Sequence, residues 1–186
     1  MIAASMKRVN VIGPPGSGKT FVSNAIGAAY GLPLVRLDAL RHGANWAEVP
    51  DELFLERVVA AAAEDAWVMD GSYPSVRPAI WERADMVIWS DLNKTVVMRQ
   101  VICRSLRDWA TGAESIPANR ERLRNFVKPW HPMRWTWTNH ARFRQREQTW
   151  LEDPRWAQLR VVRLRSRRDV DAFIESLRLL PRHGAS

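Results

Sequence analysis

Short apolar segments alternate with longer amphipathic segments along most of the chain. Five short segments are rich in β-branched or aromatic residues and are bounded by polar positions, which is typical of buried strands. They are residues 8–12, 34–37, 67–69, 86–89 and 159–164, with Val161 and Val162 as the expected buried centre of the last one.

The segments between these strands carry apolar residues at the three- and four-residue spacing of one helix face. In the first segment Val22, Ala25, Ile26 and Ala29 form the stripe, and Gly31 follows where a helix C-cap is expected. The same spacing predicts helices over residues 51–63, 95–109, 133–150 and 169–180, whereas residues 39–50 are expected to form a loop. The inward face of the helix over 95–109 is predicted to carry Met98, Val101, Ile102, Ser105 and Trp109, and that of the last helix Val170, Phe173, Ile174 and Leu177. Alternating strands and helices indicate an α/β fold, a parallel sheet covered on both faces.

A glycine-rich loop joins the first strand to the first helix. It reads Gly13-Pro14-Pro15-Gly16-Ser17-Gly18-Lys19-Thr20, which matches the phosphate-binding pattern G-x-x-x-x-G-K-S/T. The glycines bring backbone N–H groups close to phosphate oxygens, Lys19 faces the β- and γ-phosphates, and Thr20 offers a hydroxyl to Mg²⁺. Since strand, loop and helix occur in the required order, the alternative of a simple turn with a surface lysine is disfavoured. The loop predicts binding of Mg·ATP.

Two aspartates follow predicted strands. Asp38 follows the second strand and Asp70 the third. Open parallel sheets bind ligands at the carboxyl ends of their strands, so both carboxylates are site candidates. A P-loop protein needs a carboxylate near Mg²⁺ or its waters, which Asp70 can supply. The alternative for Asp70 is a plain Asp-Gly turn.

Composition and charge narrow the class of protein. The chain has 186 residues, 46% hydrophobic and 26% charged, which is typical of one globular domain over residues 1–186 with a loose tail at 181–186. No apolar run approaches the ~20 residues of a membrane span. A single cysteine, Cys103, excludes an intrachain disulfide and fits a reducing cytoplasm, and we expect it to be packed on its helix.

The basic residues are unevenly distributed. Of 28 Lys and Arg residues, nineteen lie after residue 97, and the net charge is +8. Such a basic half can serve a nucleotide's phosphates, a nucleic acid, or only solubility. Residues 130–137 interleave aromatic and basic side chains, as single-strand binders do. However, the helical spacing of Trp130, Met133, Trp137 and Ala141 favours packing.

Four stretches together resemble the adenylate-kinase-like P-loop proteins: residues 13–20, 37–40, 67–73 and 84–89. Within that group the chain is most similar to small proteins labelled DNA topology modulation proteins, over roughly residues 7–180. The resemblance implies a three-layer P-loop NTPase fold in the nucleoside-monophosphate-kinase manner. It has a five-stranded parallel sheet and a short arginine-rich lid at about residues 104–128.

The resemblance also implies roles for individual residues. The phosphates of ATP and Mg²⁺ would be held by Gly13, Pro14, Pro15, Gly16, Ser17, Gly18, Lys19 and Thr20, with Asp70 holding Mg²⁺ through water. Asp38 would orient or deprotonate an attacking hydroxyl. The acceptor would be contacted by Asp38, Arg41, Asp70, Tyr73 and Arg77, and the transferring phosphoryl group by Lys19 and the lid arginines Arg104 and Arg107. The Asp-Gly pair is followed by Ser72-Tyr73-Pro74 rather than by aromatic-Pro-Arg, so adenylate is not assigned as the acceptor.

Two functions remain open at this point. The first is a kinase that transfers the γ-phosphoryl group of Mg·ATP to a small nucleotide or other metabolite. The second is a nucleotide-dependent regulatory protein that binds DNA or RNA through its basic half. The strand-end carboxylates Asp38 and Asp70 favour the kinase, since a pure binding switch has less need of a carboxylate at the acceptor position.

Overall fold

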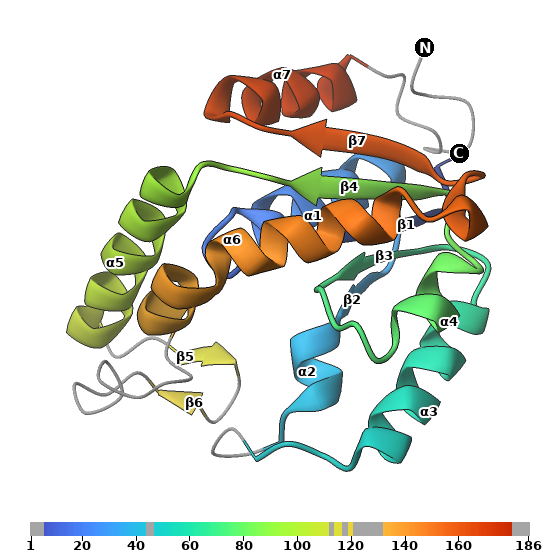
Figure 1. Ribbon diagram of the computed structural model, residues 1–186, viewed down its shortest axis with the longest axis horizontal. Coiled ribbons are helices and arrows are strands. Elements are labelled where there is room, and N and C mark those ends of the chain that lie inside the picture. The colour runs from blue at the N-terminus through green and yellow to red at the C-terminus, as the bar shows by residue number, and fades with distance from the viewer. Residues whose placement is uncertain (1–5, 44–46, 112–113, 117–118, 121–131, 180–186) are drawn as a thin grey trace.

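The structure is a computed structural model, and it describes residues 6–43, 47–111, 114–116, 119–120 and 132–179. Its main sheet has five strands in the order β2-β3-β1-β4-β7, and every neighbouring pair is parallel (Figure 1). The strands are β1 (Arg8–Ile12), β2 (Leu34–Arg36), β3 (Trp67–Asp70), β4 (Met86–Ser90) and β7 (Arg160–Leu164). The predicted five-stranded parallel sheet is therefore confirmed, with the strand that feeds the glycine-rich loop at its centre.

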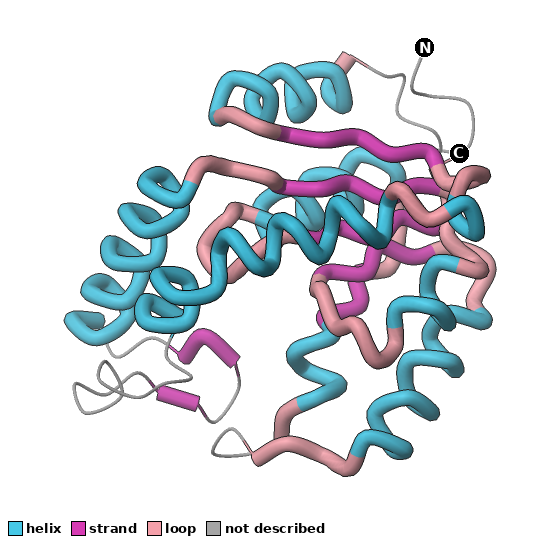
Figure 2. Tube along the Cα trace, in the orientation of Figure 1, coloured by secondary structure: helices cyan, strands magenta, loops and turns pink. Residues whose placement is uncertain are grey.

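Helices cover both faces of this sheet, which confirms the three-layer α/β prediction (Figures 1 and 2). Helices α1 (Lys19–Tyr30) and α7 (Arg167–Arg178) pack on one face, and α3 (Asp51–Ala63), α4 (Arg77–Trp81) and α6 (Pro132–Leu151) lie on the other. A hydrophobic core lies on each face of the sheet. Side chains alternate along β1, so Val9 and Val11 pack into the core under α1 and α7, and Ile12 packs into the core under α3 and α4.

Two helices, α5 (Lys94–Thr111) and α2 (Leu37–Arg41), lie at the edge of the sheet formed by the carboxyl ends of the strands (Figure 1). Helix α2 begins directly after β2. A small antiparallel pair, β5 (Glu114–Ile116) and β6 (Asn119–Arg120), follows α5. A short 3₁₀ helix, η3 (Pro154–Trp156), precedes β7. We expected a loop from residue 39, so α2 corrects that boundary.

Two predicted helix faces are rotated in the structure, and one predicted buried strand position is exposed. Helix α5 buries Val97, Val101, Ser105 and Asp108, whereas Ile102 and Trp109 are exposed. Helix α6 buries Thr136, His140, Phe143 and Glu147, whereas Trp137 is 64% exposed and Ala141 is also exposed. Val161 is exposed because β7 is an edge strand. Both helices turn polar side chains inward, which an apolar stripe cannot indicate.

Two smaller expectations have mixed outcomes. Cys103 is exposed on α5 rather than packed. The predicted stripe of the last helix is confirmed, because Val170, Phe173, Ile174 and Leu177 are all buried. None of the helices in the described part of the chain is long and apolar enough to cross a membrane. The predicted tail at 181–186 lies outside the described residues.

Candidate active site

At Gly16 and Gly18 the glycine-rich loop has a backbone that residues with a side chain rarely adopt. Gly16 has φ +79°, and a Cβ there would lie 2.2 Å from Cγ2 of Val101 on α5. Gly18 has φ +83° and is the residue from which α1 begins. Left-handed backbone at both positions folds the chain tightly around the start of α1, where backbone N–H groups and the helix dipole favour an anion.

Hydrogen bonds hold this loop from two neighbouring strand ends. The N–H of Gly13 donates to Oγ of Ser72 after β3 at 3.0 Å, and Oγ of Ser90 at the end of β4 donates to the carbonyl of Ser17 at 2.6 Å. The N–H of Ser17 donates to the carbonyl of Pro14 at 3.1 Å. Oγ of Ser17 is buried and has no hydrogen-bond partner in the described structure. Therefore the loop offers a preformed cradle with an unused hydroxyl inside it.

Lys19 lies against this loop, and three other charged side chains affect its pKa. Its Nζ donates to the carbonyl of Pro14 at 3.0 Å. Burial lowers the pKa of Lys19, the carboxylates of Asp70 and Asp38 oppose that shift, and the positive charge of Arg104 adds to it. Both predicted strand-end carboxylates thus act electrostatically on the one ammonium group.

Asp70 and Thr20 are directly joined. Oγ1 of Thr20 donates to Oδ2 of Asp70 at 2.7 Å, while Oδ1 of Asp70 is buried with no hydrogen-bond partner among the described residues. Asp70 is brought here because β3 pairs with β1, with Asp70 opposite Val11. A hydroxyl and a carboxylate at the mouth of the loop are suited to Mg²⁺ with waters completing its shell. The described part of the chain has no group of three or more His, Cys, Asp or Glu residues that could hold a metal alone.

Asp38 lies in the first turn of α2 and is joined to Tyr73. The hydroxyl of Tyr73 donates to Oδ1 of Asp38 at 2.6 Å. The Tyr73 ring packs edge-on against Phe54 of α3, with ring centroids 5.1 Å apart. Burial raises the pKa of Tyr73, and the negative charge of Asp38 raises it further. This pair is a second polar contact at the carboxyl edge of the sheet.

The guanidinium of Arg41 is occupied by hydrogen bonds to residues 48–51. Its Nη1 donates to Asp51 at 2.6 Å and to the carbonyl of Val49 at 3.2 Å, and its Nη2 donates to Glu48 at 2.6 Å. The group also lies 5.3 Å from the ring centroid of Phe54. The expected contact of Arg41 with an acceptor stays a prediction, since in the structure its donors bind the segment between α2 and α3 and the first residue of α3.

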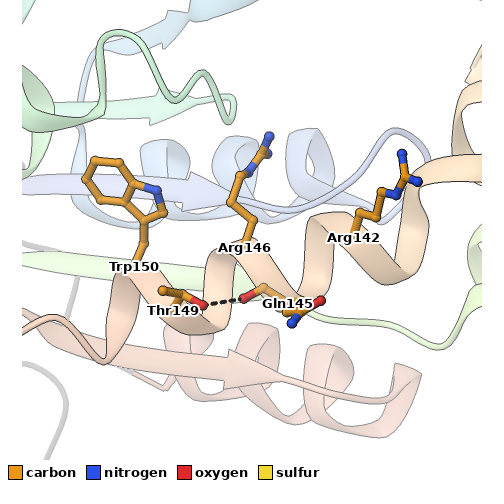
Figure 3. Close-up of a pocket in the computed structure, with 5 residues that line it drawn as sticks. All are labelled: Arg142, Gln145, Arg146, Thr149 and Trp150. Carbon is orange, nitrogen blue, oxygen red and sulfur yellow. Dashed lines mark hydrogen bonds between the residues drawn. The ribbon is translucent and has the colours of Figure 1, made fainter.

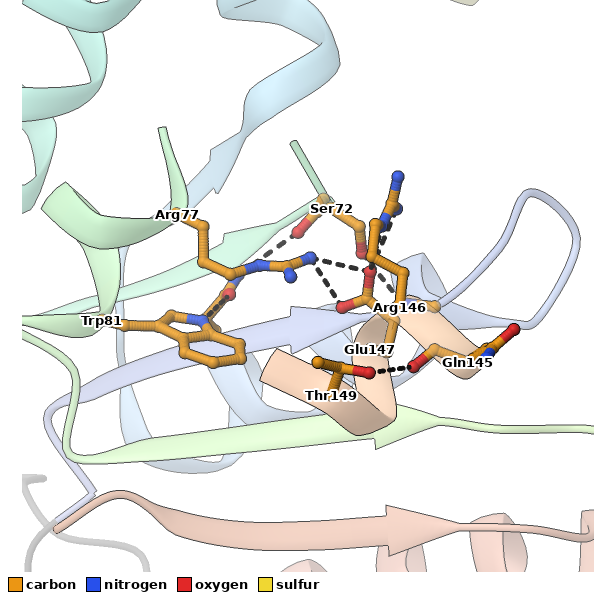
Figure 4. Close-up of polar contacts among 10 residues, drawn as sticks. Ser72, Arg77, Trp81, Gln145, Arg146, Glu147 and Thr149 are labelled. Atoms are coloured by element: carbon orange, nitrogen blue, oxygen red, sulfur yellow. Dashed lines mark hydrogen bonds and ion pairs between the residues drawn. The ribbon is translucent and has the colours of Figure 1, made fainter. Parts of the chain in front are cut away.

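Arg77 corrects the sequence-based expectation that it faces an acceptor. Its side chain is 2% exposed, and its Nη2 donates to both oxygens of Glu147 on α6, at 2.7 and 2.6 Å (Figure 4). The guanidinium lies 5.0 Å from the ring centroid of Trp81 and 4.8 Å from that of Trp150. Burial lowers the pKa of Arg77, and Glu147 opposes that shift. A wholly buried carboxylate on α6 requires a cation, and Arg77 supplies it.

The two expected lid arginines are both on α5. Arg104 is exposed and near enough to Lys19 to affect its pKa. Arg107 has a side chain 72% exposed, and its Nε lies 3.5 Å from the carboxylate of Asp108. The first part of the predicted lid, residues 104–111, lies in α5, which runs to Thr111 and so extends two residues beyond the predicted helix. Residues 112–113, 117–118 and 121–128 of the predicted lid lie outside the described residues.

Sequence reasoning missed a cluster on α6. A pocket of about 320 Å³ lies along this helix, with Arg142, Arg146 and Trp150 projecting to the same side (Figure 3). Gln145 and Thr149 complete its lining. Nε and Nη2 of Arg146 donate to Oε1 of Glu147 at 3.1 and 3.0 Å, so the carboxylate that binds Arg77 also orients Arg146 (Figure 4). The four-residue spacing of Arg142 and Arg146 was the available signal.

Comparison with known proteins agrees with this architecture. No protein-family model matches the chain, and no curated protein matches it. Among solved structures, it is similar to shikimate kinase from Bacteroides thetaiotaomicron, with 15% identity, 94% of this chain and 97% of that chain covered, and a TM-score of 0.53. It is similar to a gluconokinase from Sinorhizobium meliloti 1021, with 18% identity, 92% and 93% covered, and a TM-score of 0.51.

A third similar structure is shikimate kinase from Acinetobacter baumannii in complex with shikimate, with 13% identity, 94% of this chain and 93% of that chain covered, and a TM-score of 0.50. Identities at this level show the fold alone, and that fold is the P-loop kinase fold. The expected likeness to DNA topology modulation proteins finds no support in these comparisons.

Proposed function

We propose that this protein is a kinase that transfers the γ-phosphoryl group of Mg·ATP to a hydroxyl of a small anionic metabolite. The observation that carries the proposal is the pair of carboxylates around Lys19. Asp70 is bound to Thr20, Asp38 is bound to Tyr73, and both oppose the lowering of the Lys19 pKa. One carboxylate suits the metal side of a phosphoryl transfer and the other suits the attacking side.

The residues fit Mg·ATP as follows. The loop N–H groups and Lys19 would hold the phosphates, and Thr20 and Asp70 would hold Mg²⁺ directly or through water. The bound nucleotide supplies the phosphoryl group, and the metal neutralises its charge. The orphaned Oδ1 of Asp70 and the glycine cradle support this assignment.

On the attacking side, Asp38 would accept the proton of the acceptor hydroxyl as that oxygen bonds to the transferring phosphorus. The bond from phosphorus to the departing oxygen breaks, and its electron pair leaves with the ADP product. Arg104, near Lys19, would add positive charge where charge develops, since phosphoryl transfer depends mainly on positioning and neutralisation.

An anionic acceptor is favoured by the α6 pocket. Arg142 and Arg146 line it, and Glu147 links Arg146 to Arg77 at the start of α4. Arg77 directly follows the segment between β3 and α4 that carries Tyr73, so Glu147 connects the pocket-lining Arg146 to the end of that segment. Arginine forks bind carboxylates and phosphates in two-pronged contacts. The similar kinases named for shikimate and gluconate support a small hydroxylated acceptor of this kind.

The regulatory alternative has less support. Arg144 on α6 and Arg163 on β7 both bind the buried carboxylate of Asp91. These arginines of the basic half hold α6 and β7 together. No feature of the described residues favours a nucleic acid over a small acceptor.

The test is ADP formation from Mg·ATP with a panel of sugar acids, sugar phosphates, nucleosides and nucleotides. At least one anionic class should raise ADP formation above the acceptor-free rate, and Lys19→Ala should lose most of that activity. Lys7→Ala, which removes an exposed lysine before β1, is the matched control.

Two results would contradict the proposal. One is equal Mg·ATP binding by Lys19→Ala and the wild type in calorimetry, and the other is the absence of any acceptor-stimulated turnover. A gel shift that survives physiological salt and prefers one sequence would favour the regulatory alternative.

A further inference from the structure

Asp38 and Tyr73 come from separate elements that the sheet brings together. Asp38 follows β2 and Tyr73 follows β3, and these strands pair with Arg36 opposite Asp70. The two segments approach closely, because a Cβ on Gly71 would lie 2.8 Å from Cβ of Leu37. The glycine between Asp70 and Tyr73 thus lets the chain after β3 lie against the start of α2.

The hydroxyl of Tyr73 is held firmly, whereas the Asp38 carboxylate is not. The Tyr73 ring packs against Phe54 at an interplanar angle of 69°, and Arg41 covers Phe54. Asp38 itself is exposed, and among the described residues the Tyr73 hydroxyl is the group that donates a hydrogen bond to its side chain. Tyr73, whose ring packs against Phe54 of α3, is therefore placed to orient the exposed carboxylate of Asp38.

This contact leaves one carboxylate oxygen available. Tyr73 donates to Oδ1 at 2.6 Å, so Oδ2 retains its capacity to accept a proton. Burial and the charge of Asp38 keep the phenol protonated, because both raise the pKa of Tyr73, so the phenol retains the proton that it donates to Oδ1. Oδ1 of Asp38 is thus used to orient the carboxylate, and Oδ2 is left to accept a proton.

We propose that Tyr73 is a positioning residue whose hydroxyl orients Asp38, so that the second carboxylate oxygen takes the proton of the attacking hydroxyl. This inference rests on the proposed kinase function. It adds the residue that orients Asp38 for accepting a proton. Tyr73 itself need not touch the acceptor. Its effect should appear in turnover rather than in nucleotide affinity.

The first experiment is a double-mutant cycle measured by transfer kinetics. Tyr73→Phe keeps the ring against Phe54 and should lower kcat about tenfold, a fraction of the ~10²–10⁴ that a positioned base contributes. The KM for Mg·ATP should stay unchanged. In an Asp38→Ala background the same change should lower kcat less than about twofold, because residues that act as one unit are not additive.

The matched control is Tyr30→Phe, which removes the hydroxyl of the other tyrosine of the chain on α1 and should leave kcat unchanged. Equal losses from Tyr73→Phe in both backgrounds, or a change confined to the acceptor KM, would overturn the inference while the kinase function stands. A wild-type protein that transfers to no acceptor would overturn both.

A second experiment needs no activity. In Tyr30→Phe protein, Tyr73 is the one remaining tyrosine, so its phenolate absorbance can be titrated directly. The charged groups that act on this phenol are Asp38 and Arg41 on α2 and Glu48 in the following segment. Its midpoint should lie above that of free tyrosine and should fall on addition of Asp38→Ala. An unchanged midpoint would overturn the contact in solution, and the inference with it.

Discussion

The proposed nucleotide side and the proposed acceptor side of this site are built in different ways. On the nucleotide side, consecutive residues from Gly13 to Thr20 provide the glycines, the lysine and the hydroxyl, and Asp70 alone comes from elsewhere. On the acceptor side, Asp38 and Tyr73 lie on two separate segments, which the pairing of β2 with β3 brings together. The first side is encoded locally, whereas the second depends on long-range packing.

The largest expected effect separates chemistry from nucleotide binding. Asp38→Asn should slow transfer by ~10²–10⁴, the contribution of a lost general base, with the lower end for a dissociative transition state. Mg·ATP binding should remain nearly intact, because Asp38 belongs to the acceptor side. Single-turnover transfer and calorimetry measure the two quantities. Asp65→Asn, exposed just before β3, is the control, and loss of nucleotide binding in Asp38→Asn would erase the distinction between the sides.

The next effect concerns the stability of the acceptor side. Glu147→Gln should lower the free energy of unfolding by about 3–5 kcal/mol, because it leaves the buried guanidinium of Arg77 without its counter-charge. Urea unfolding measures the loss. Glu175→Gln, which breaks an exposed pair with Arg178 on α7, should cost no more than about 1 kcal/mol. Similar losses in both variants would mean that α6 is not fixed by the Arg77–Glu147 pair.

A smaller effect tests the one long-range residue of the nucleotide side. Asp70→Asn should weaken the Mg²⁺ dependence of nucleotide binding by about 10–100-fold, the usual range for a residue that supports a metal through other groups. Nucleotide binding at saturating Mg²⁺ should be less affected. A metal titration of ATP binding gives both quantities, and an unchanged Mg²⁺ dependence would remove Asp70 from the metal site.

The smallest effect is a pH dependence of the nucleotide side. Because burial lowers the pKa of Lys19 below 10.5, its ammonium loses its proton at a lower pH than an ordinary lysine. Mg·ATP affinity should therefore fall several-fold as pH rises through that pKa, since the phosphates bind the protonated form. Within that window binding should take up a fraction of a proton, which calorimetry in two buffers detects.

Lys19→Arg is the matched control for this pH effect, because arginine stays charged throughout the range. It should abolish the proton uptake. Uptake that persists in Lys19→Arg would assign the titration to another group.

Features that depend on local sequence could be predicted, whereas features that depend on distant partners could not. The glycine-rich loop, its flanking strand and helix and the five strands of the sheet were predictable, because each depends on a local pattern. Arg77 was not, because its role is decided by Glu147, a carboxylate on a distant helix. The sequence alone cannot distinguish an arginine that faces a pocket from one that pairs with a remote carboxylate.

The rotated helix faces have a related cause. An apolar stripe identifies the inward face only when the buried side chains are apolar. Helix α6 instead buries His140, whose Nε2 lies 3.0 Å from the carbonyl of Leu92, and Glu147, which binds Arg77. Such polar contacts are specified by groups on other elements, so hydropathy along α6 misplaces its inward face. The same limitation hid Arg142 and Arg146.

The close approach of Gly16 to Val101 couples the phosphate loop to α5. Val101 occupies the space that a side chain at position 16 would need, so the loop and the helix share one contact surface. Arg104 follows Val101 by about one helical turn on α5, and its charge acts on Lys19. A change in the position of α5 would therefore shift the Gly16 backbone and the Arg104 charge together.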